Sequence, residues 1–182
     1  MRSKGYSATE LLVVVIIVGI IAAAAVPRFS ASDSYKLDLA ATQVAEAIRF
    51  ARSESMRTGR VHGITISQTT QRVRVREYDM SADPVNPTVT ARHPLTKQLY
   101  DFDFDDAPTT LGVAITNTQD VFDYTGLGRR KTVLFNAEGV PMWFLASGPS
   151  THNLSVGAVS LSMGAVQRKV GVAPYTGRVA IQ

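Results

Sequence analysis

The stretch that decides the fold is Gly5-Tyr6-Ser7-Ala8-Thr9-Glu10, followed by an unbroken apolar run from Leu11 to Val26 and then Pro27. As an α-helix this run is about 24 Å long, and the segment from Tyr6 to Val26 reaches about 31 Å. That length matches a hydrocarbon core of about 30 Å, so the segment predicts a membrane-spanning helix that includes Glu10. A carboxylate near the end of such a helix costs about 2–3 kcal/mol, so Glu10 needs either a charged partner or an interfacial position.

The order of features before the run allows two hypotheses about processing. Arg2 and Lys4 come first, then Gly5 and the acid, and only then the apolar residues. In an ordinary secretory signal peptide, a basic start leads into about 7–15 apolar residues and then a small-residue cleavage site. Such a signal would be cut within Ala22–Ala25. Cleavage between Gly5 and Tyr6 would instead leave the helix on the mature chain.

The N-terminus resembles the class III signal of type IV pilins and pseudopilins over about the first 30 residues. The matching residues are Lys4-Gly5, Tyr6, Glu10, Leu11-Leu12-Val13-Val14-Val15 and Pro27-Arg28-Phe29. The resemblance implies that a prepilin peptidase cuts after Gly5 and that the new amino group of Tyr6 is N-methylated. It also implies that Glu10 neutralises the Tyr6 ammonium of a neighbouring subunit, which would offset the desolvation of both charges.

Length, charge and cysteine content fit one exported domain behind the helix. The chain has 182 residues and a formal charge of +4, which falls to +2 when Arg2 and Lys4 leave with the leader. These two residues predict a cytoplasmic N-terminus, a single pass through the bacterial inner membrane and a periplasmic C-terminal domain. No cysteine is present, so the C-terminus must close without a disulfide. The predicted segments are 1–5 (leader peptide), 6–30 (transmembrane and assembly helix), 31–59 (amphipathic half of the same helix) and 60–182 (β-rich globular domain).

The helical pattern continues beyond Pro27, where we expect a kink. Apolar and small residues recur in steps of three and four, which predicts one helix from about Ser7 to Thr58 whose second half packs on a β-domain and ends before Gly59. The stripe consists of Leu37, Ala41, Val44, Ile48, Ala51 and Ser55. We expect a solvated face, with positive charge at the helix C-terminus, from Arg49, Arg52, Arg57 and Arg60. Contact of these arginines with a neighbouring subunit is the alternative.

After Gly59 the period changes to two, which predicts antiparallel strands. Arg72, Arg74 and Arg76 alternate with valines, so this strand has one basic and one apolar face. We expect a loop over 83–94, where three prolines lie, and turns at 68–71, 126–130 and 136–139. Strands are expected near 61–66, 72–76, 99–104, 132–135, 140–145, 153–163, 166–173 and 177–182. The predicted fold class is α+β: a long N-terminal helix packed on an antiparallel β-sheet domain, as in pilins.

Three shorter pieces look like the GspH/FimT group, which comprises the H-type minor pseudopilins of type II secretion and the FimT-like minor pilins of type IV pili. They are Ala51-Arg52-Ser53-Glu54-Ser55, Leu134-Phe135-Asn136-x-x-Gly139 and Thr176-Gly177-Arg178-Val179. Many FimT-like proteins carry cysteines, which this chain lacks. The resemblance implies a structural filament subunit without a cofactor. Its partners would be other pilins or pseudopilins, the prepilin peptidase/N-methyltransferase and the inner-membrane assembly platform. Secretion and pilus biogenesis use the same helix, so both systems stay open.

A DNA-binding minor pilin for natural transformation is the alternative function. Some FimT-like proteins are thought to bind DNA through a Gly-Arg-x-Arg element. Gly177-Arg178-Val179-Ala180 matches its first arginine and has alanine in place of the second. Further basic candidates are Arg129, Arg130 and Lys131, and the arginine face of 72–76. So few phosphate contacts predict only weak, salt-sensitive binding.

Enzymatic and metal functions are not indicated by the sequence. Its three histidines are scattered, and it shows no nucleophile elbow and no phosphate-binding loop; the histidines are His62, His93 and His152. A group of acids could suggest calcium, but the glycine and the closing glutamate of an EF-hand are absent. These acids are Asp101, Asp103, Asp105 and Asp106. We therefore predict a protein that is not an enzyme and holds no metal.

Overall fold

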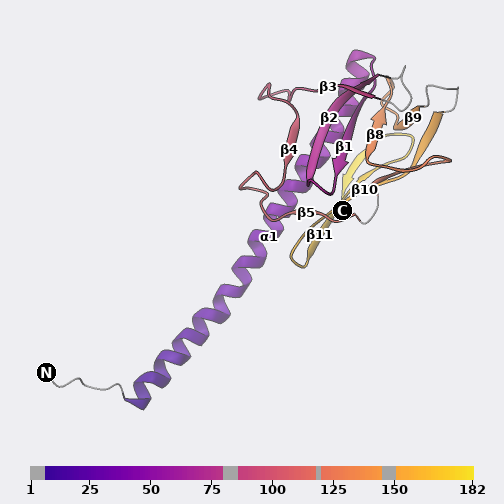
Figure 1. The fold of residues 1–182 in the computed structure, drawn as a ribbon. Helices are drawn as coiled ribbons and strands as arrows, with labels where there is room; N and C mark the ends of the chain where they lie inside the picture. Colours follow the sequence, from indigo (N-terminus) through magenta and orange to yellow (C-terminus); the bar gives the residue numbers. More distant parts are fainter. Residues whose placement is uncertain (1–6, 80–85, 118–119, 145–150) are drawn as a thin grey trace.

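A long helix and a β-domain make up the chain (Figure 1). The computed structural model describes residues 7–79, 86–117, 120–144 and 151–182, and within the helix it leaves the side chains of 23–31 undescribed. Helix α1 (Ala8–Thr58) has its C-terminal half in the domain, and its N-terminal half projects away. The predicted α+β class and helix ends are confirmed. Because α1 continues through Pro27, the proline does not end the helix, and the kink stays a prediction.

Two antiparallel sheets form the β-domain. The first has the order β3-β2-β1-β8, and β4 pairs with β2. Its strands are β1 (His62–Ser67), β2 (Arg72–Asp79), β3 (Asn86–Thr90), β4 (Asp101–Asp103) and β8 (Thr132–Phe135). The second has the order β12-β11-β10-β6-β7, and both β5 and β9 pair with β10. Its strands are β5 (Ala114–Ile115), β6 (Phe122–Tyr124), β7 (Gly128–Arg130), β9 (Met142–Phe144), β10 (Thr151–Met163), β11 (Val166–Val172) and β12 (Val179–Ile181).

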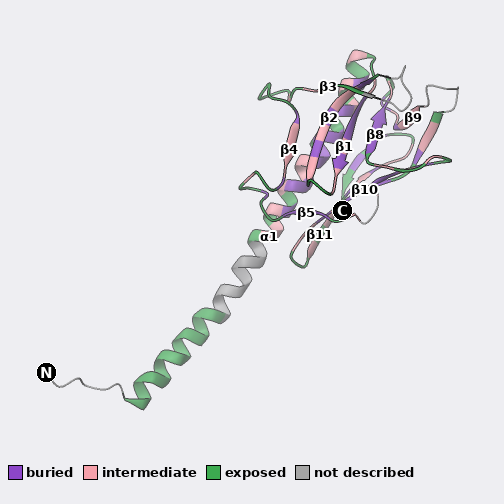
Figure 2. Cartoon of the chain, viewed as in Figure 1, coloured by how far each residue is buried: buried purple, intermediate pink, exposed green. Residues whose placement is uncertain are grey.

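Strands of both sheets pack on one face of α1, and this face forms the centre of the core (Figure 2). The whole predicted stripe from Leu37 to Ser55 is fully buried, as expected. The buried face is broader than the stripe, because Ala40, Ala45 and Ala47 are also fully buried. Alanine contributes little apolar area but lets neighbouring backbones approach closely, so two sheets can share one helix.

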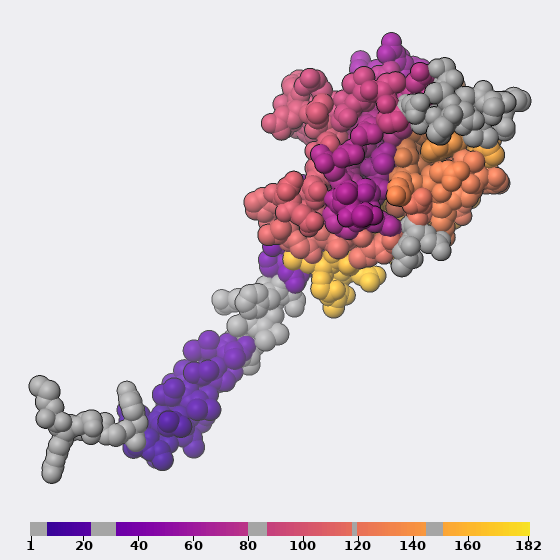
Figure 3. Space-filling view, viewed as in Figure 1, coloured from indigo at the N-terminus to yellow at the C-terminus, as the bar shows by residue number. Residues whose placement is uncertain are grey.

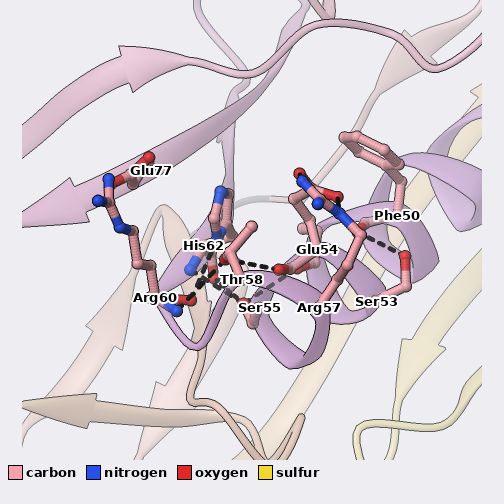
Figure 4. A network of polar contacts seen from close by, with 10 residues as sticks. Phe50, Ser53, Glu54, Ser55, Arg57, Thr58, Arg60, His62 and Glu77 are labelled. Carbon is pink, nitrogen blue, oxygen red and sulfur yellow. Dashed lines mark hydrogen bonds and ion pairs between the residues drawn. The ribbon is translucent and has the colours of Figure 1, made fainter.

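A buried serine joins the end of α1 to the first strand (Figure 4). Ser55 Oγ donates to the carbonyl of Ala51 at 3.0 Å and accepts the N–H of His62 at 3.0 Å. Gly59 ends the helix in the left-handed region at φ 69°, and its N–H donates to the carbonyl of Ser55 at 2.9 Å. These contacts fix the direction in which β1 leaves the helix.

Several strand predictions are wrong, most of them for very short strands. The predicted loop 83–94 contains strand β3, whose Pro87 lies at a register shift against β2. Proline is tolerated there because an edge strand leaves some N–H groups unpaired. The predicted turn 126–130 contains β7, and no strand was expected at β5 or β6. Strands of two or three residues are too short to show a period of two.

A substitution at Gly63 of β1 tests how closely the backbones of the first sheet approach each other. A Cβ at Gly63 would lie 2.4 Å from the carbonyl oxygen of Val133 on β8. We expect Gly63→Ala to destabilise the full-length chain by about 2 kcal/mol or more, because the backbone must shift. Gly171→Ala on β11 is the control, since its Cβ would meet no atom closer than 3.9 Å. Thermal unfolding followed by circular dichroism in detergent measures both; equal losses would contradict the close approach.

Candidate functional site

Glu10 lies in the first turn of α1 and is exposed. Ser7 caps this end: its Oγ accepts the N–H of Glu10 at 3.4 Å. The Glu10 carboxylate forms no ion pair with any residue in the described ranges. The predicted cleavage site at Gly5 and Tyr6 lies outside those ranges, so the pairing of Glu10 with a Tyr6 ammonium stays a prediction.

The projecting half of α1 has large apolar side chains on all sides. All ten valine, leucine and isoleucine side chains from Leu11 to Ile21 are between 51% and 65% exposed, so the domain covers none of them (Figure 2). A continuous apolar surface of this kind marks a site of association. Among the residues that the structure describes, no helix is both long and apolar enough to cross a membrane. The predicted span also includes residues 23–26, whose side chains are not among those described.

Arginines of α1 hold two turns that are distant in sequence. Arg52 Nε donates to the carbonyl of Gly139 at 3.0 Å. Gly177 lies against the same groups: a Cβ there would be 2.7 Å from the Gly139 oxygen and 3.1 Å from Arg52 Nε. One turn earlier on the helix, Arg49 Nη2 donates to the carbonyl of Val179 on β12 at 3.4 Å. We call these five residues the C-terminal clamp.

The C-terminal clamp closes the chain without a disulfide. It brings together the three pieces that resemble the GspH/FimT group, which come from α1, from the turn after β8 and from the turn before β12. Gly177 is buried and has a φ of 62°, so both its conformation and its surroundings favour glycine. The expectation of a solvated face is wrong for Arg52, which is half-buried; Arg57 and Arg60 are exposed and pair with Glu54 and Glu77.

The predicted DNA-binding residues do not form one surface. Arg178 is exposed just before β12, and Arg129 and Lys131 are exposed at β7. Strands β12 and β7 are the two ends of the strand order in the second sheet. Arg130 is half-buried, with its guanidinium carbon 5.8 Å from the ring centroid of Trp143. The two groups of basic residues are therefore separated by the width of the sheet.

Two of the three arginines on the basic face of β2 are neutralised. Arg72 Nε and Arg74 Nε both contact the carboxylate of Asp101, at 2.6 and 3.2 Å. The hydrogen bond to Asp101 raises the pKa of Arg72. Asp103 Oδ1 accepts the N–H of Asp105 at 2.9 Å, as in a turn. These acids thus support the fold, and within the described part of the chain no group of three or more His, Asp or Glu could hold a metal ion.

The three histidines lie on separate elements and contact backbone atoms. His62 is buried, with Nδ1 3.2 Å from the carbonyl of Arg60. His93 Nδ1 accepts the N–H of Leu95 at 3.3 Å. His152 Nδ1 lies 2.8 Å from the carbonyl of Thr125. These contacts give each ring a structural role in its own turn or strand.

Comparison with known proteins finds similar structures. No protein-family model and no curated protein matches the sequence. The minor pseudopilin EpsH from the type 2 secretion system of Vibrio cholerae has a TM-score of 0.49 at 11% identity, covering 81% of this chain and 96% of that one. The type IV minor pilin FimU of Pseudomonas aeruginosa, in two crystal forms, has TM-scores of 0.45 and 0.44 at 13% identity. Each FimU structure covers 80% of this chain, with 87% and 92% of its own chain matched. These structures are of a minor pseudopilin and a minor pilin.

Arg52→Ala tests the C-terminal clamp. Removing the guanidinium leaves the carbonyl of the buried Gly139 without its donor, so we expect a loss of about 1.5–3 kcal/mol in stability. The amides of β12 should exchange faster with deuterium, because the turn at Gly177 loses its support. Arg57→Ala is the matched control, since Arg57 is exposed and pairs only with Glu54. Unchanged protection of β12 in Arg52→Ala would show that the clamp does not hold the C-terminus.

Proposed function

We propose that this chain is a minor pilin or pseudopilin of the GspH/FimT type, a structural subunit of a type IV pilus or a type II secretion pseudopilus. The observation that carries the proposal is the projecting half of α1, which is apolar on every side and begins with Glu10, a carboxylate that pairs with no residue among those the structure describes. An exposed apolar helix of this kind must be shielded from water by lipid or by other protein. Lipid of the inner membrane covers it before assembly, and the helices of other subunits cover it in the filament.

Glu10 then fixes the register in which neighbouring subunits assemble. A prepilin peptidase removes residues 1–5, and the N-methylated ammonium of Tyr6 becomes the new end of the chain. The assembly platform moves the subunit from the inner membrane into the filament, where Glu10 meets the Tyr6 ammonium of a neighbour. A buried carboxylate without a partner is strongly destabilising, so only the register that pairs both charges is favourable. Pro27 marks the passage from this assembly segment to the half of α1 that carries the periplasmic domain.

Glu10→Val tests this role. We expect normal removal of the leader, because the cleavage site is unchanged, but at least about a tenfold loss of incorporation into filaments, since the Tyr6 ammonium would be buried alone. Immunoblots of sheared filaments against membranes measure the ratio, and the shift in mass on leader removal reports cleavage. Glu10→Asp, which keeps the charge, is the control. Normal incorporation of Glu10→Val would contradict the pairing of Glu10 with the Tyr6 ammonium.

DNA binding is the second candidate function, favoured by the exposed Arg178, Arg129 and Lys131. These residues lie at opposite ends of a sheet. We therefore expect the unchanged chain to bind a DNA duplex no more tightly than the variants Arg178→Ala and Arg129→Ala do. Fluorescence anisotropy of the full-length chain in detergent, across a salt series, measures this. Binding that weakens with rising salt and on either substitution would favour a pilus that takes up DNA.

A further inference from the structure

Tyr175 lies in a strained turn just before β12. Its φ is 63°, in the left-handed region that bulky residues rarely adopt. The carbonyl of Pro174 accepts the N–H of Thr176 across it at 2.7 Å, as in a γ-turn. The Tyr175 side chain is nevertheless 68% exposed. Packing in the domain therefore does not explain an aromatic residue at a position whose backbone favours glycine.

Two other non-glycine residues with a positive φ occur in the described ranges, Gln71 and Lys97. The Gln71 side chain stabilises the fold, because its Oε1 accepts the N–H of Ile115 at 2.5 Å. Lys97 is exposed, as Tyr175 is, but carries no ring. Backbone strain around an exposed aromatic side chain is typical of a binding residue.

Hydrogen bonds on both sides hold the turn in place. The N–H of Gly177 donates to the carbonyl of Ala173 at 3.0 Å, and the N–H of Ala173 donates to the carbonyl of Arg178 at 2.8 Å. The C-terminal clamp joins the same turn to α1, where Gly177 lies against Arg52. The backbone at Tyr175 is therefore fixed before binding, so a partner orders less of the chain when it binds.

Three arginines converge on this turn, and none of them forms an ion pair with a residue that the structure describes. Arg178 is exposed within the turn. Arg49 and Arg52 reach it from α1 and donate to backbone carbonyls of the clamp. A guanidinium has five N–H donors, so both keep donors for a partner. We call Tyr175, Arg49, Arg52 and Arg178 the basic tyrosine patch.

The acids closest to the patch along the chain do not neutralise it. Glu46 precedes Arg49 by three residues on α1, and Glu138 precedes Gly139 of the clamp. Neither carboxylate forms an ion pair within the described ranges. Glu138 instead accepts a hydrogen bond from Asn136 in its own turn. Three arginines against two acids leave the patch with a net positive charge.

We propose that the basic tyrosine patch binds an acidic segment of a different filament protein. The inference rests on the proposed function and names one contact between this minor subunit and a neighbour of another kind. In Figure 3 the projecting half of α1 stands clear of the domain, which leaves the sides of the domain open to neighbours. Tyrosine and arginine are enriched among the residues that dominate protein interfaces. Carboxylates of the partner pair with the arginines, and an apolar side chain between them packs on the Tyr175 ring.

Nucleic acid fits the patch less well than an acidic protein segment does. Arg52 is half-buried, and both Arg49 and Arg52 already donate to carbonyls, so Arg178 is the most accessible of the three cations. So few phosphate contacts, with a single ring for stacking, predict weak and salt-sensitive binding to a nucleic acid strand. A folded partner can instead place its carboxylates at the donors that remain.

Photo-cross-linking in the assembling cell tests the contact. The photoreactive residue p-benzoylphenylalanine replaces Tyr175 in the full-length chain or, as the control, Lys97, which is also exposed and left-handed. We expect position 175 to cross-link another filament subunit at least about fivefold more than position 97 does, at a peptide that carries carboxylates. Mass spectrometry of sheared filaments maps the product. Equal yields would overturn the proposal, as would products with only a second copy of this chain or with nucleic acid.

A glycine at position 175 separates binding from folding. Glycine adopts a φ of 63° without strain, so we expect Tyr175→Gly to unfold at an unchanged or higher temperature. With the photoreactive residue at the exposed Thr176, Tyr175→Gly should reduce the cross-link at least about fivefold. Lys97→Gly, which relieves the same strain elsewhere, is the control and should leave the yield unchanged. An unchanged yield in Tyr175→Gly would overturn the role of the ring.

Charge reversal tests the pairing of the arginines. Arg178→Glu should reduce the cross-link from Thr176 at least about fivefold, and a lysine in place of the mapped carboxylate of the partner should restore it. A loss without rescue would overturn the pairing. Incorporation is scored on the same filaments. If the chain is incorporated but position 175 gives no more product than position 97, the filament function stands and this contact fails; a chain absent from filaments contradicts both.

Discussion

The close packing of two sheets on one alanine-rich face of α1 is the constraint on which the structure depends. Alanines at 40, 41, 45, 47 and 51 are fully buried against the strands, and the Ser55 hydroxyl accepts the N–H of His62 at the start of the first strand. Close-packed protein interiors transmit displacements instead of absorbing them. The same helix continues into the projecting apolar half, so the packed face and the segment that begins with Glu10 belong to one element.

The C-terminal clamp extends this dependence to the last residues. A chain without cysteine cannot use a disulfide to lower the conformational entropy of its unfolded state. Its C-terminus must therefore be held by non-covalent contacts of the folded state. Arg52 suits this purpose, because a guanidinium on a long stem can reach a carbonyl across a turn while its methylenes pack against Gly177. The glycines at 139 and 177 follow from the same geometry: any side chain at Gly177 would occupy the space between helix and turn.

The sequence predicts those parts of the fold in which a period is long enough to detect. The stripe from Leu37 to Ser55 and the alternation in β2 identify the packed helix face and a sheet with one buried side, and both predictions are confirmed. The short strands β5, β6 and β7 are missed because their pairing to the long β10 or to one another, and not their own pattern, defines them. The clamp is missed because Arg52 differs from a solvated arginine only in its surroundings. The one signal in the sequence is that three short family-like pieces occur together.

The same chemical group has two different uses along α1, and the surroundings decide between them. Two opposite charges 4 Å apart attract by about 1 kcal/mol in water and by about 4 kcal/mol at the effective dielectric constant of a protein surface. Glu10 would enter an apolar filament core, where an unpaired charge is prohibitive, so its pairing decides whether a subunit joins. Glu54 stays near solvent, where its pair with Arg57 contributes little stability and is screened by salt. Pairing of the first kind would favour one register among several that the apolar helix alone would accept, because apolar contact is not directional.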